Sequence, residues 1–129
     1  MAHWTDAYIG LPYIEEVQDC AEVVARVQRE VFGRLVTVPG VRAEGPFGKS
    51  AQIAQGAQDL ADPVADPLEG DVVLMQVRGL WHVGVLFYVD EPWVLHALRS
   101  SGQVVSHRLR ELAGVGVRVE GYYRMRCDG

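Results

Sequence analysis

The stretch DVVLMQVRGLWHVGVLFYVDEPWVLHAL, residues 71–98, decides the fold of this chain of 129 residues. It holds three apolar runs of strand length, rich in the branched and aromatic residues that favour extended backbone. Turn-forming sequences separate the runs, Arg78-Gly79 after the first and Asp90-Glu91-Pro92 after the second. The predicted strands are 71–77, 81–89 and 93–98. Short strands joined by tight turns predict an antiparallel meander.

Outside this stretch the chain predicts two more strands and a helix. The strands lie C-terminal to it, at 102–107 and 116–125. A helix over 20–32 is indicated by apolar residues that recur at helical spacing, and Gly33 supplies its end. The apolar stripe of this helix consists of Cys20, Val23, Val24, Val27 and Val31.

The remaining segments connect these elements. A short helix near Trp4 precedes a turn or extended stretch at Gly10-Leu11-Pro12. Residues 36–49 read as a loop, 50–60 as a short helix and 62–67 as a turn-rich connector. Neither a repeat nor a change of composition divides the chain, so we expect a single domain over residues 1–129. The predicted class is α+β, with N-terminal helices packed on one face of an antiparallel sheet of about five strands.

Composition excludes several classes of function. A net charge of -5 and a pI near 5.3 argue against a nucleic-acid binder, which would carry a basic face. No apolar run is long enough for a membrane span, so we expect no membrane insertion. The segment Met1–Asp6 lacks the basic and apolar parts of a signal peptide. We therefore expect synthesis in the cytoplasm and, if the target lies outside it, delivery by another machine.

Cys20 occupies a position that favours a reactive thiol. Asp19 is a natural N-cap, and Cys20 then falls in the first helical turn, where the helix dipole favours the thiolate. The alternative is a small buried apolar residue, since Cys20 also belongs to the apolar stripe. The second cysteine, Cys127, is third from the end, and we expect no disulfide between the two.

Two histidines lie on neighbouring predicted strands. A hairpin centred near Asp90 would set His82 beside His96, at about 4.5–5.5 Å between Cβ atoms. His82 is then a candidate general base for Cys20, with His96 orienting its ring. Two alternatives remain: each histidine is an ordinary core or surface residue, or Cys20 and both histidines bind zinc. The zinc alternative lacks any short-range pair of ligands such as Cys-x-x-Cys.

An ordered set of short motifs resembles the NlpC/P60 family of cysteine peptidases. The set spans the chain from about Trp4 to Arg124, in the order found in the family. It consists of Tyr8-Ile9-Gly10-Leu11-Pro12-Tyr13, Asp19-Cys20, Gly70-Asp71-Val72-Val73, His82-Val83-Gly84-Val85 and Leu95-His96-Ala97. The segment Gly121-Tyr122-Tyr123-Arg124 is similar to the closing strand of members from phage tails.

The resemblance implies a papain-like fold and an activity. The family hydrolyses amide bonds in the peptide stems of peptidoglycan, commonly after γ-D-glutamate. By position, Cys20 would be the nucleophile of this thiol peptidase, His82 the general base and His96 the third, orienting residue. Tyr13 would line the site near the oxyanion, and Asp19 would help to hold the free amine of the substrate. The resemblance implies neither a metal nor another cofactor.

The chain also departs from the family pattern around the nucleophile. Many members have Asp-Cys-Ser-Gly, whereas Ala21 and Glu22 follow Cys20 here, and the missing serine leaves the specificity open. Three acidic residues, Glu15, Glu16 and Glu22, would lie near the thiolate. They would weaken it by raising its pKa, or select a cationic substrate end, or form a solvated rim.

Three settings fit these features. The leading one is a cell-wall amidase or endopeptidase of a phage tail or phage-like particle, which would contact tail proteins and stem peptides. The same chemistry fits a toxin injected by a contractile machine and stored with an immunity protein. From another class, a tail-assembly protein would keep the fold with little or no activity. An acyltransferase is disfavoured, because its permuted relatives place the histidine before the cysteine.

Overall fold

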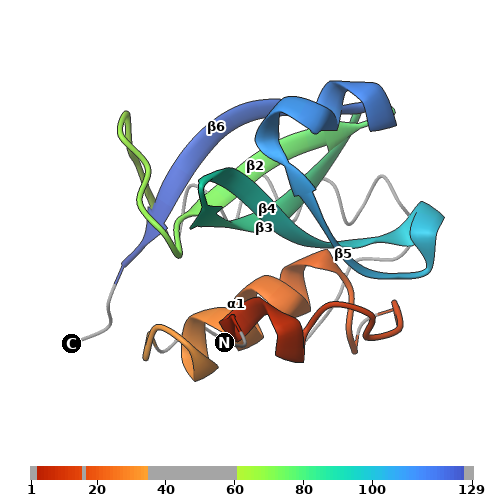
Figure 1. The fold of residues 1–129 in the computed structure, drawn as a ribbon, viewed down its shortest axis with the longest axis horizontal. Helices are drawn as coiled ribbons and strands as arrows, with labels where there is room; N and C mark the ends of the chain where they lie inside the picture. Colours follow the sequence, from red (N-terminus) through yellow and green to blue (C-terminus); the bar gives the residue numbers. More distant parts are fainter. Residues whose placement is uncertain (1–2, 16, 35–60, 127–129) are drawn as a thin grey trace.

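The computed structural model describes residues 3–15, 17–34 and 61–126. In this part of the chain an antiparallel sheet of six strands packs against the helix that begins at Cys20, so the predicted α+β class is confirmed (Figure 1). In chain order the elements are η1 (Trp4–Ala7), α1 (Cys20–Glu30), β1 (Ala61–Pro63), β2 (Val72–Val77), β3 (Leu80–Val89), β4 (Glu91–Leu98), η2 (Arg99–Ser101), β5 (Gln103–Arg108), η3 (Leu109–Val115) and β6 (Val117–Met125). The loop predicted at 36–49 and the helix predicted at 50–60 lie outside the described residues.

The sheet has the strand order β1-β6-β2-β3-β4-β5. Strands β2 to β5 form the predicted meander, and β6 returns to pair with β2. The sixth strand was not predicted: Asp62 and Pro63, assigned to a connector, belong to β1, which pairs with β6. Proline is tolerated there because β1 is an edge strand, where an N–H donor is not required on the open side.

The two hairpin turns lie where the sequence places them. Arg78 and Gly79 both have positive φ, 54° and 78°, which a two-residue turn between β2 and β3 requires. Asp90, at φ 64°, turns the chain between β3 and β4. The strand before this turn ends at Val89 as predicted, but the next one begins earlier than the predicted Trp93, since Pro92 belongs to β4 and pairs with Tyr88. Pairing with β5 begins only at Trp93, so Pro92 has a strand neighbour on one side alone.

Helix α1 begins at the predicted residue and ends slightly early. The side chain of Asp19 accepts a hydrogen bond from the backbone N–H of Glu22, which confirms the N-cap. The helix ends at Glu30, two residues before the predicted end at residue 32. Gly33, with φ 66°, lies in the segment that follows the helix. The inward face is buried as the spacing predicts, at Cys20, Val23, Val24 and Val27.

Each face of the sheet carries its own apolar cluster. One cluster lies between the sheet and α1, and the other includes Leu112 of η3. In Figure 1, α1 and η3 lie on opposite sides of the sheet. The α1-side cluster includes Val72, Leu74, Val83, Val85, Phe87, Leu95 and Ala97. The η3-side cluster consists of Val73, Met75, Leu86, Val94, Leu112 and Val117. Helical structure therefore covers both faces, whereas the sequence predicted helices on one face only.

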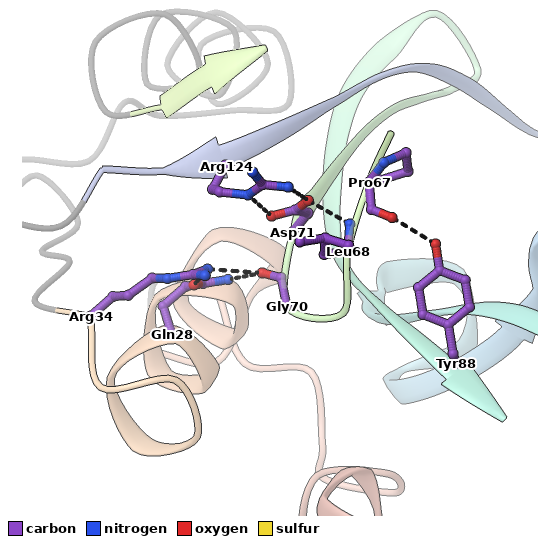
Figure 2. Close-up of polar contacts among 8 residues, drawn as sticks. All are labelled: Gln28, Arg34, Pro67, Leu68, Gly70, Asp71, Tyr88 and Arg124. Atoms are coloured by element: carbon purple, nitrogen blue, oxygen red, sulfur yellow. Dashed lines mark hydrogen bonds and ion pairs between the residues drawn. The ribbon is translucent and has the colours of Figure 1, made fainter. Parts of the chain in front are cut away.

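A polar network fixes the turn that leads into β2 (Figure 2). The carboxylate of Asp71, which is fully buried, accepts two hydrogen bonds from the Arg124 guanidinium, at 2.8 and 3.0 Å, and one from the backbone N–H of Leu68. The buried side-chain amide of Gln28, on α1, donates to the carbonyl of Gly70 at 2.7 Å. The turn is thereby attached both to β6 and to the helix.

No helix of the described residues is long and apolar enough to cross a membrane.

Candidate active site

Three imidazoles from three neighbouring strands form a hydrogen-bonded row. Nε2 of His82, on β3, lies 2.8 Å from Nδ1 of His96, on β4. Nε2 of His96 lies 2.9 Å from Nδ1 of His107, on β5. Successive rings meet edge to face, with centroids 5.1 and 5.2 Å apart. We call His82, His96 and His107 the histidine row.

The row begins where the ladder between β3 and β4 ends. This ladder runs from the turn as far as Val85 opposite Leu95 and stops there, immediately before His96. In the described residues, the rest of β3 pairs with β2 and the rest of β4 pairs with β5. His82 and His96 lie just past the end of the ladder, where their imidazoles are hydrogen bonded.

The contact between His82 and His96 is diagonal, which corrects the prediction that they are direct neighbours. Gly84 lies beside His96, and a Cβ atom on Gly84 would be only 3.1 Å from the Cβ of His96. The same Cβ would be 2.6 Å from Cγ1 of Val94 and 2.8 Å from the carbonyl oxygen of Leu95. Glycine thus lets β4 approach β3 closely, and the longer His82 side chain reaches His96 across the gap.

Replacing Gly84 with Ala is expected to destabilise the fold by roughly 1–3 kcal/mol, the usual cost of overpacking a buried site. The added methyl group would push against the β4 backbone and separate the two imidazoles. Urea unfolding measures the first effect, and histidine NMR spectra measure the second. The control is Gly121→Ala, because a Cβ there meets only a Tyr123 ring carbon at 3.6 Å. Equal stability of both variants would contradict the prediction.

Burial controls the charge states of His82 and His96. Only 8% of His82 and 1% of His96 is exposed. Burial lowers the pKa of His82 to about 4. Burial, together with the neighbouring His82 and His107, lowers the pKa of His96 to about 2. Both rings are therefore neutral near pH 7, where each nitrogen pair needs one donor and one acceptor.

These pKa shifts predict a loss of stability in mild acid. Below pH 6.5 the unfolded chain binds protons on His82 and His96, whereas the folded protein does not until the pH reaches the lowered values. The unfolding free energy is thus unaffected above pH 6.5 and falls as the pH decreases from 6.5. His82 alone accounts for roughly 3 kcal/mol by pH 4. Urea titrations at pH 7, 5 and 4 test this.

The control for the acid effect is His82→Gln. The glutamine amide reaches the position of Nε2 and does not titrate. Between pH 6.5 and 4, unfolding of the variant should take up about one proton fewer than unfolding of the wild type, which makes the unfolding free energy less dependent on pH. An unchanged pH dependence would show that His82 titrates normally in the folded protein.

Cys20 lies at the start of the helix that covers the two strands of the site. It forms no disulfide within the described residues and is 9% exposed, and α1 packs against β3 and β4. Cys20 shares the α1-side cluster with Val83, the residue next to His82. Strand alternation turns His82 to the other face, where its paired neighbour is Met75. By this alternation Cys20 lies on the α1 side of the sheet and His82 on the η3 side, near the end of the β3–β4 ladder.

Tyr13 is positioned by an extended segment that runs along β5. The backbone N–H of Gly10 donates to the carbonyl of Val104, and that of Val104 donates to the carbonyl of Leu11, both at 2.8 Å. The backbone N–H of Tyr13 then donates to the carbonyl of Gly102 at 2.9 Å. The half-buried Tyr13 packs against the α1-side cluster, to which Cys20 also belongs. Of the two alternatives predicted for 10–12, a turn or an extended stretch, the structure shows both: Gly10, with φ 92°, lies in a turn, and Pro12 forms a β-bridge with Gln103.

A tight loop joins Tyr13 to the helix start. The backbones of Ile14 and Gln18 are hydrogen bonded in both directions, and the Gln18 amide donates to the carbonyl of Pro12 at 2.6 Å. Glu15 forms an ion pair of 3.5 Å with Arg99 of η2, so its charge is compensated. Glu22 lies in the first turn of α1, and Glu16 is outside the described residues. Asp19 is 2% exposed and is engaged in capping the helix.

The zinc alternative has no support in the structure. Among the described residues, no group of three or more His, Cys, Asp or Glu side chains is arranged to hold a metal ion. Four nitrogens of the histidine row are instead used in hydrogen bonds between the rings.

His107 is the residue of this site that the sequence analysis missed. Its signal was present, because it lies on the predicted strand next to that of His96. In the register, His107 pairs with Val94 and Val105 pairs with His96, so His96 and His107 share a face. Sequence alone does not supply that register, since the β4–β5 connection includes the unpredicted turn η2.

No family model matches this chain, and no curated protein matches it.

Proposed function

We propose that this protein is a papain-like cysteine hydrolase of NlpC/P60 type that cleaves amide bonds in peptidoglycan stem peptides. The observation that carries the proposal is the hydrogen bond of 2.8 Å between Nε2 of His82 and Nδ1 of His96. It engages one nitrogen of His82 and leaves Nδ1 as the nitrogen for a thiol. A helix that begins at Cys20 packs over the same two strands.

The proposed reaction begins at the thiol. Nδ1 of His82 accepts the proton of Cys20, and the sulfur attacks the amide carbonyl carbon. A carbon–sulfur bond forms while the carbonyl π electrons move to oxygen. Backbone N–H groups at the start of α1 stabilise the resulting negative charge. Tyr13 borders the same region.

The second half of the reaction restores the enzyme. The carbon–nitrogen bond breaks, and the imidazolium of His82 donates its proton to the leaving amine. Water then attacks the thioester, with His82 accepting one of its protons, and the carbon–sulfur bond breaks. The sulfur regains a proton, and a carboxylic acid leaves. Throughout, His96 accepts from Nε2 of His82 and so holds the ring in position.

The test of this function is digestion of defined muropeptides, with the products read by mass. We expect a mass gain of one water and cleavage within the peptide stem, with a new free amine. A panel should include stems with and without diaminopimelate, because Glu22 in the first turn of α1 favours a cationic group nearby. Intact stems after prolonged incubation at pH 7 would reject the proposal.

One observation favours the catalytically weak alternative of a tail-assembly protein with this fold. The lowered pKa of His82, caused by burial, opposes a stable pair of thiolate and imidazolium. Alkylation of Cys20 at neutral pH separates the two functions. Rapid alkylation that slows in His82→Ala supports the hydrolase, and slow alkylation that is unaffected by His82→Ala supports the scaffold.

The phage-tail setting and the injected-toxin setting of the hydrolase both assume the same cleavage of stem-peptide amide bonds.

A further inference from the structure

We propose that His107 is a positioning residue that sets the tautomers of the histidine row, so that Nδ1 of His82 presents a lone pair to the thiol. The inference rests on the proposed function and extends its three-residue site to a fourth residue. It is carried by the hydrogen bond of 2.9 Å between Nε2 of His96 and Nδ1 of His107 and by the greater exposure of His107 than of His82.

Two hydrogen-bond directions are possible, because neutral His96 carries a single ring proton. In the first, Nε2–H of His82 donates to His96, and Nε2–H of His96 donates to Nδ1 of His107. In the second, both donations are reversed. The first direction leaves an unprotonated Nδ1 on His82, which a general base needs. The second leaves an N–H at that position.

The exposure of the ends favours the first direction. His82 is buried and His107 is half-buried. In the first direction the terminal N–H of the row is Nε2–H of His107, at the more exposed end, where water accepts it. In the second direction the terminal N–H is Nδ1–H of His82, whereas in the described part of the chain the one hydrogen bond of the His82 side chain is that of Nε2 with His96. A buried donor without an acceptor is costly, whereas a solvated donor is not.

The strands hold His107 in place for this role. His107 lies on β5 opposite Val94, and Val94 belongs to the buried η3-side cluster. Its ring meets that of His96 at an interplanar angle of 68°. Without His107, Nε2 of His96 loses its acceptor, and the tautomer of His96 with its proton on Nδ1 becomes accessible. That proton would face Nε2–H of His82 and drive the proton of His82 to Nδ1.

The experiment compares three substitutions of His107. In His107→Asn the amide oxygen can take the position of Nδ1 and accept from His96, whereas in His107→Gln the amide reaches toward the position of Nε2. His107→Leu offers no acceptor. Kinetics on a cleaved muropeptide give kcat and KM, and long-range ¹H–¹⁵N spectra give the tautomers of His82 and His96. His3→Asn, which alters the histidine outside the row, is the control.

We expect His107→Leu and His107→Gln to lower kcat by roughly 10- to 100-fold with little change in KM, the scale seen when a partner of a functional histidine is lost. The spectra of both should show mixed tautomers at His96. His107→Asn and His3→Asn should keep the wild-type kcat and tautomers. Wild-type kcat and tautomers in His107→Leu or His107→Gln would overturn the inference, as would a loss in His107→Asn equal to that in His107→Leu.

Failure of the inference and failure of the proposed function are distinguishable. The spectra need no substrate, so they decide the tautomers of the row even if no muropeptide is cleaved. In that case, mixed tautomers in His107→Leu and wild-type tautomers in His107→Asn would uphold the structural role of His107 and reject only the hydrolase. If His107→Leu does not fold, the comparison of His107→Asn with His107→Gln decides the question.

Discussion

Replacing Cys20 with Ala is expected to abolish muropeptide cleavage while the protein stays folded. Removal of a covalent nucleophile lowers kcat by at least about 10⁴-fold, because the remaining groups stabilise charge but form no thioester. Alanine suits the first turn of a helix, and the sulfur it removes is small. The change in unfolding free energy should therefore stay near 1 kcal/mol. Product masses and urea unfolding measure the two effects.

Two further variants sharpen this result. Cys20→Ser keeps the size of the side chain and replaces the thiol by a hydroxyl, which His82 would have to activate, so it should also be inactive or nearly so. Cys127→Ala changes the other cysteine of the chain and should leave cleavage intact. Full cleavage by Cys20→Ala would reject the whole mechanism. Loss of cleavage in Cys127→Ala would assign the second thiol a role that the proposal does not give it.

Replacing Asp71 with Ala is expected to lower the unfolding free energy by about 3 kcal/mol, the lower end of the range for breaking a buried ion pair. The change removes a fully buried carboxylate together with the three hydrogen bonds that it accepts. Arg124 is 39% exposed and regains some hydration, whereas the N–H of Leu68 loses its side-chain partner. The turn that leads into β2 would loosen (Figure 2). Guanidinium chloride unfolding at pH 7 measures the loss.

The matched control is Asp62→Ala. Asp62 pairs with Arg126 at 3.1 Å, but both side chains are well exposed, at 68% and 46%. An exposed pair of this kind contributes about 0–1 kcal/mol, because water competes for both charges. Similar losses in the two variants would show that the burial of Asp71 has no energetic consequence. A much larger loss in Asp71→Ala would support the attachment of the turn to β6.

Local patterns were sufficient for most of the sheet. The predicted strands in residues 71–125 correspond to β2 through β6. They could be predicted because the apolar runs of strands and the residues that form turns are recognisable over a few consecutive positions. The short strand β1 was missed, since its three residues contain a proline and depend on β6 for pairing. The 3-10 helix η3 was also missed, because the burial of Leu112 against the far face of the sheet is a tertiary effect.

The candidate site, too, could be predicted only in part from the sequence. The cap at Asp19 and the position of Cys20 in the first turn follow from neighbouring residues, and the structure confirms both. The pairing of His82 with His96 was predicted from the hairpin, but as direct neighbours. Its diagonal geometry depends on Gly84 and on the end of the β3–β4 ladder, which are results of packing.

By itself, the sequence determined the helix start at Cys20, the positions of five strands in residues 71–125, and the presence of histidines on adjacent strands. Those features depend on residues close together in the chain, whose hydrogen bonds and alternation are local. Only the tertiary structure decided that three imidazoles join in one row, that two of them are buried enough to stay neutral, and that β6 closes on β2. Such features arise from contacts between distant segments, because register, burial and strand order are properties of the whole packed sheet.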